Sequence, residues 1–88
     1  MSYKVFELVV DEDADKIWFE LIPVKDFELS KVDIKAIEMG LEIEDYTFLP
    51  APNGGTYLVT KKDHIDPESI DPSGCTVRHK KGGFMVVD

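Results

Sequence analysis

The sequence has very little cysteine, no long apolar run and few basic residues. Cys75 is the only cysteine among 88 residues, which excludes an internal disulfide and favours an intracellular, cytoplasmic location. No stretch approaches the roughly 18 consecutive apolar residues of a membrane-spanning helix. The first residues, MSYKVFELVV, lack the basic region and cleavage site of a signal peptide. We therefore expect one small domain over residues 1–88, with no membrane partner.

The sequence also lacks the motifs of cofactor and metal sites. No glycine-rich nucleotide or dinucleotide fingerprint occurs, so we expect no cofactor. Residues 11–15, DEDAD, resemble the start of a calcium-binding EF-hand loop. The pattern then fails, because the glycine required at the sixth position is Lys16 and the glutamate required at the twelfth is Ile22. One cysteine and two histidines are too few for a typical zinc ligand set, and we expect no metal.

Acidic residues are in clear excess. Eighteen acids stand against ten bases, a net charge of −8. Residues 1–45 hold thirteen acids and five bases, whereas residues 46–88 hold five of each. This charge opposes direct binding to nucleic acid or anionic lipid, since both would be repelled, but it suits a partner protein with a basic surface. The alternative is that the acidity only keeps a small protein soluble.

The hydrophobic pattern predicts an α+β fold, in which an antiparallel β-sheet of about six short strands packs against one short α-helix. The element order is ββ-α-ββ-ββ. The expected strands are residues 2–10, 17–22, 42–49, 56–60, 75–79 and 84–87, and the expected helix is 30–41. In the first strand Phe6, Leu8 and Val10 share one face, and Tyr3, Val5 and Val9 share the other.

The helix carries signals at both ends and two apolar ridges. Ser30 and Asp33 predict a capping box, and Gly40 predicts a left-handed stop. Val32, Ala36 and Met39 form one ridge, while Ile34 and Ile37 form the second. One sheet face buries only one ridge well, so the second needs a cover. We predict that residues 84–86 or a second copy of the chain covers Ile34 and Ile37, and we favour a two-fold homodimer.

The leading functional hypothesis is a non-enzymatic protein-binding module. Small, very acidic single-domain chains without catalytic motifs are common among phage-encoded inhibitors and small regulatory proteins. The chain would act as such an inhibitor or regulator by covering a basic surface, for example a nucleic-acid-binding groove, with carboxylates that imitate phosphates. The predicted partner-binding residues are Asp11, Glu12, Asp13, Asp15, Glu42, Glu44 and Asp45.

Two rival hypotheses use other features of the sequence. Cys75, His64 or His79 could act in the pocket of a small enzyme or ligand-binding domain. A plain structural or assembly subunit is the third hypothesis. The cluster RHKK at 78–81 is the sole concentrated positive charge, and an acidic first half could pair with it head to tail between copies.

Overall fold

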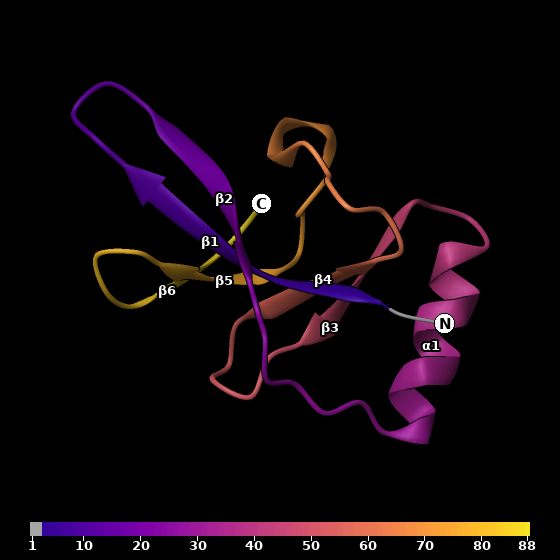
Figure 1. Cartoon of the computed structure of the whole chain (residues 1–88). Helices are drawn as coiled ribbons and strands as arrows, with labels where there is room; N and C mark the ends of the chain where they lie inside the picture. The colour runs from indigo at the N-terminus through magenta and orange to yellow at the C-terminus, as the bar shows by residue number, and fades with distance from the viewer. Residues whose placement is uncertain (1–2) are drawn as a thin grey trace.

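The computed structural model describes residues 3–88, and it has the predicted α+β architecture of one helix on a six-stranded sheet (Figure 1). The elements, in chain order, are β1 (Lys4–Glu12), β2 (Ile17–Pro23), α1 (Lys31–Leu41), β3 (Tyr46–Pro50), β4 (Thr56–Thr60), the 3₁₀ turn η1 (Pro67–Ser69), β5 (Thr76–His79) and β6 (Phe84–Val86). The predicted order is therefore confirmed.

The sheet is built around the long strand β1. Its residues 6–12 pair antiparallel with β2 along one edge. The other edge is divided, because residues 4–8 pair antiparallel with β4 while Val9 and Val10 pair in parallel with β5. Strands β3 and β6 then extend β4 and β5, in the order β3-β4-β1-β5-β6. The sheet is thus mostly antiparallel, with one short parallel pairing that the sequence did not predict.

Both faces of this sheet are covered. On one face, Leu8 and Val10 pack with Ile65 and Ile70 from the segment between β4 and β5. On the other face, Val5 packs with Ile37 of α1. The alternation predicted for the first strand is confirmed, and each of its faces contributes to a separate core.

The sequence prediction is correct for the start of α1 and wrong for its end. The Ser30 hydroxyl accepts from the Asp33 amide at 3.0 Å and the Asp33 carboxylate accepts from the Ser30 amide at 3.2 Å, which is the expected capping box. The left-handed stop at Gly40 is wrong, because the helix continues to Leu41 and ends on Glu42 in helical geometry. Gly40 is instead required by packing: a Cβ there would lie 2.5 Å from the Thr47 hydroxyl oxygen.

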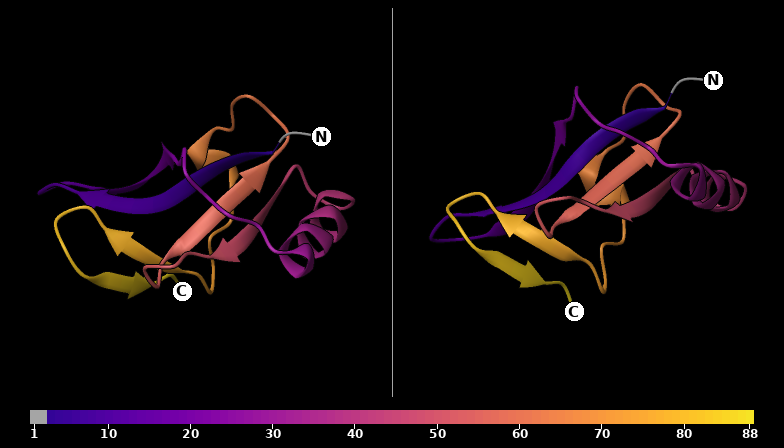
Figure 2. Two further views of the ribbon diagram at one scale, coloured as in Figure 1. Left: turned by 60° about the horizontal axis from the view of Figure 1, so that its bottom comes forward. Right: turned by 90° about the horizontal axis from the view of Figure 1, so that it is seen from below.

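The expected roles of the two helix ridges are reversed. Ile37 is fully buried in the core shared with Val5 and Val59 of the sheet, and Ile34 is half-buried, whereas Val32 and Met39 are 78% and 61% exposed. Ile37 is therefore a core residue of the single chain and cannot serve in self-association. The predicted cover by β6 is also wrong, because α1 packs on β3, at the far end of the strand order from β6 (Figure 2).

The chain between α1 and β4 differs slightly from expectation. The strand expected from residue 42 begins only at Tyr46, because the amides of Ile43 and Glu44 both donate to the Gly40 carbonyl and prolong the helical end. The turn after β3 is as predicted, with Gly54 at a φ of 96° that favours glycine. This turn is one wall of the groove described below.

Candidate functional site

The acidic turn between β1 and β2 is held by its own carboxylates. Asp13 accepts hydrogen bonds from the amides of Asp15 and Lys16 at 2.8 and 3.0 Å. These amide donors hold the pKa of the Asp13 carboxyl below its ordinary value. Asp11 accepts similarly from the Glu12 amide at 2.9 Å. Asp11 and Asp13, two of the four acids predicted to bind a partner at this end of the hairpin, therefore already accept hydrogen bonds from backbone amides.

The basic turn between β5 and β6 lies against this acidic hairpin (Figure 1). The His79 imidazole Nε2 is 3.0 Å from a Glu12 carboxylate oxygen, and the Lys80 ammonium is 3.0 Å from Glu20 and 3.9 Å from Asp11. The Lys81 ammonium donates to the Glu12 carbonyl at 2.8 Å. The parallel pairing of β1 with β5 brings these groups together.

Glu7 and Arg78 form the most buried ion pair of this contact. The guanidinium Nε and Nη2 each donate to one Glu7 carboxylate oxygen at 2.9 Å, and the Asn53 amide donates to the same carboxylate at 2.9 Å. The Arg78 hydrogen bonds are the largest cause that lowers the pKa of Glu7 below its ordinary value. The cationic cluster at residues 78–81 thus pairs with acids of its own chain, which removes the basis for head-to-tail pairing between copies through it.

The second group of predicted acids lies elsewhere on the molecule. Glu42, Glu44 and Asp45 connect α1 to β3, at the opposite end of Figure 1 from the β1–β2 turn. Asp45 pairs with the Lys62 ammonium at 2.8 Å, while Glu42 and Glu44 are exposed and make no ion pair within residues 3–88. The structure therefore does not bring the seven predicted residues together into one acidic surface.

The three candidate catalytic residues have three different surroundings. Cys75 precedes β5 and is half-buried, and burial is the main cause that raises the pKa of its thiol above the ordinary value. His79 ends β5 and is bound to Glu12, with its Nδ1 accepting from the Lys81 amide at 3.1 Å. His64 lies in a small hollow beside Asp45 and Lys62. A thiol with a raised pKa is a poor nucleophile, and neither histidine is hydrogen-bonded to it in the described chain.

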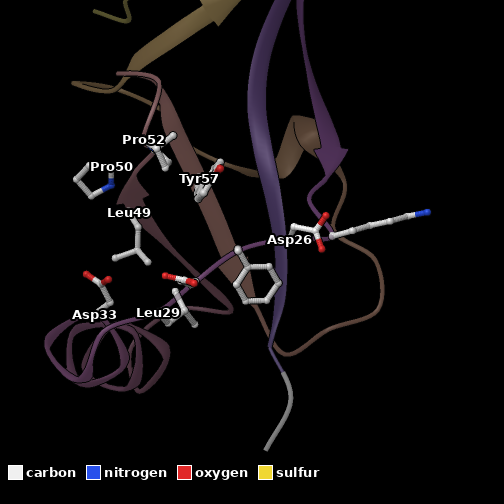
Figure 3. A pocket seen from close by; sticks show the side chains of 11 residues that line it. Asp26, Leu29, Asp33, Leu49, Pro50, Pro52 and Tyr57 are labelled. Carbon is white, nitrogen blue, oxygen red and sulfur yellow. The ribbon is translucent and has the colours of Figure 1, made fainter.

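A groove of about 810 Å³ lies at the start of α1. Its walls are the β2–α1 connection, residues 25–29, and the turn between β3 and β4 (Figure 3). Leu29, Leu49 and Tyr57 line it between Asp33 on the α1 side and Asp26 on the β2 side (Figure 3). The remaining lining residues are Lys25, Phe27, Glu28, Pro50, Ala51 and Pro52. The groove combines an apolar floor with an acidic rim.

The charge of the groove is unbalanced. Asp26, Glu28 and Asp33 line it against Lys25 alone. Asp26 and Glu28 are exposed and make no ion pair within residues 3–88, and Asp33 uses one oxygen for the capping box. The lining therefore has a net negative charge that the described chain does not compensate. We did not predict this site from the sequence. The available signal was VKDFEL at residues 24–29, in which charged residues separate three apolar side chains that pack against the core.

Comparison with known proteins identified no relative of this chain. No protein-family model, curated protein or solved structure matches the chain. Within residues 3–88 no helix is long and apolar enough to cross a membrane, and no cluster of three histidine, cysteine or acidic side chains is arranged to hold a metal ion.

Proposed function

We propose that the protein is a non-enzymatic binding module whose acidic groove takes a basic, partly apolar segment of a partner protein. The observation that carries this proposal is the uncompensated carboxylate rim of Asp26, Glu28 and Asp33 around an apolar floor. This rim replaces the β1–β2 turn as the proposed contact surface, because Glu12 and Asp11 already contact His79 and Lys80 of their own chain. Asp13 in turn accepts from two backbone amides, which leaves only Asp15 of the four predicted acids without such a partner in residues 3–88.

The chemistry of the groove selects the class of partner segment. An arginine or lysine side chain can lay its methylene stem on Leu29, Leu49 and Tyr57 while its charged end meets the carboxylates of the rim. Pro50 and Pro52 stiffen the opposite wall, which limits the entropy lost on binding. A segment that alternates basic and apolar residues therefore fits this site best.

Binding in the groove competes with the other ligands of the partner's basic segment. A basic segment held in the groove is withheld from any nucleic acid or other anion that it would otherwise bind, which is how an inhibitor or regulator acts. The net charge of −8 adds long-range attraction that raises the association rate and makes it sensitive to salt. The raised pKa of the Cys75 thiol supports a binding role over nucleophilic catalysis.

The proposal is tested with a fluorescein-labelled peptide in which arginine alternates with leucine. Binding is followed by fluorescence anisotropy at low and at high salt, for the wild type and for the double variant Asp26→Lys/Glu28→Lys. We expect the variant to lose affinity by about tenfold or more at low salt, because two attractions become repulsions inside one groove. Asp33 is left unchanged, since it caps α1.

A matched control separates the groove from overall charge. Asp15→Lys/Glu68→Lys makes the same change in net charge at two exposed positions outside the groove. We expect this control to weaken binding only slightly, and less as salt is added. The proposal is rejected if the two double variants lose affinity equally, or if the groove variant binds like the wild type.

A further inference from the structure

The outer face of α1 carries a continuous apolar ridge that no other segment of residues 3–88 covers. It consists of Val32, Ala36, Met39 and, just beyond the helix, Ile43. Val32, Met39 and Ile43 are 78%, 61% and 84% exposed, and Val32 and Ile43 are the two most exposed large hydrophobic side chains in residues 3–88. Their alternating spacing of four, three and four residues is that of the seam between two paired helices.

Charged residues follow one side of this ridge and change sign along it. At 100° per residue, Lys31, Lys35, Glu38 and Glu42 form one stripe beside the ridge. The two lysines lie in the first half of the helix and the two glutamates at its end. Lys35 and Glu42 are exposed and make no ion pair within residues 3–88. The stripe is therefore complementary to a copy of itself that runs in the opposite direction.

We infer that the outer face of α1 is a self-association surface, on which a second copy packs antiparallel about a two-fold axis. In this arrangement Ala36 meets Met39 of the second copy, and Val32 meets its Ile43. The two-fold axis keeps both charged stripes on the same side of the seam. Lys35 of each copy then lies beside Glu42 of the other, which gives two equivalent ion pairs.

The charges also fix the direction of pairing. A parallel pair would place Lys35 beside Gly40 of the second copy and would form no ion pair. Ala36, a small residue at the middle of the ridge, lets the two helix axes approach closely. The surface uses neither Asp26 nor Glu28, so a failure of the dimer would leave the proposed groove function intact.

The test exploits the two-fold symmetry by charge reversal. Sedimentation equilibrium from micromolar to near-millimolar concentration is measured for the wild type, Lys35→Glu, Glu42→Lys and an equimolar mixture of the two variants. Each variant alone faces like charges at both pairs, so we expect its dimer to be weaker by roughly tenfold. In the mixture, one copy of each variant restores both attractions, and we expect heterodimers near wild-type affinity.

Two surface reversals outside the seam, Lys61→Glu and Glu68→Lys, serve as controls and should associate like the wild type. Thermal melting by circular dichroism shows whether each variant is folded. A wild type that stays monomeric over the whole range overturns the inference. So does a mixture that associates no better than its separate components, because heterodimer rescue requires the antiparallel contact of Lys35 with Glu42.

Discussion

At the scale of single residues, the placement of each carboxylate decides what it can do. Glu7 is bound by Arg78 and Asn53, and its side chain is only 13% exposed. Asp26 and Glu28 have the same charge but lie exposed at a groove without an ion pair in the described chain. The net charge of the sequence therefore overstates the acidity available to a partner, because some of the carboxylates are already bound within the chain.

Glu7 makes the stability of the fold depend on pH. Its pKa in the folded chain is lowered from 4.5, chiefly by the Arg78 hydrogen bonds. The stabilisation is therefore complete above that ordinary value and is lost as the pH falls through the lower folded pKa. We expect Glu7→Gln to lower the free energy of unfolding by about 1–2 kcal/mol at neutral pH.

Urea unfolding at a series of pH values checks this expectation. The gap between the wild type and Glu7→Gln should shrink as the solution becomes more acid than the ordinary glutamate pKa. Glu68→Gln, at an exposed carboxylate, should unfold like the wild type throughout. A gap that is constant with pH would show that the Glu7 carboxylate charge contributes nothing through Arg78.

At the scale of elements, α1 shows which features can be predicted from residues that lie close together in the sequence. Its capping box depends on Ser30 and Asp33, three residues apart, and it was predicted correctly. The choice between its two ridges depends on which face meets the sheet, and the capping residues do not specify that face. Leu41, half-buried on the same side as Ile34 and Ile37, widens that ridge into the larger apolar face. This widening was the available sign that the isoleucine ridge faces the core.

The ridge assignment predicts two very different alanine substitutions. Ile37→Ala removes a fully buried side chain and should cost about 2–5 kcal/mol in the free energy of unfolding. Met39→Ala removes an exposed one and should change it by less than about 0.5 kcal/mol. Urea unfolding at low protein concentration, where association does not contribute, compares the two. Equal costs would mean that α1 is rotated from the orientation described.

At the scale of the whole molecule, contacts between distant segments determine the site. The strand faces and turns were predictable because they depend on neighbouring residues. The parallel pairing of Val9 and Val10 with β5 joins residues about seventy positions apart, and alternation carries no information on strand order. That pairing brings His79 and Lys80 against Glu12, Asp11 and Glu20, whereas Asp26 and Glu28 at the groove make no ion pair within residues 3–88.

We propose that the groove at the start of α1, and not the acidic β1–β2 turn, receives a basic partner segment. A titration of ¹⁵N-labelled protein with the arginine–leucine peptide, followed by amide chemical shifts, tests it most directly. We predict saturable shifts in residues 25–29 and at Leu49, Ala51 and Tyr57, with little change in residues 11–16. Shifts concentrated in residues 11–16, or small and unsaturable shifts spread over the surface, would contradict the claim.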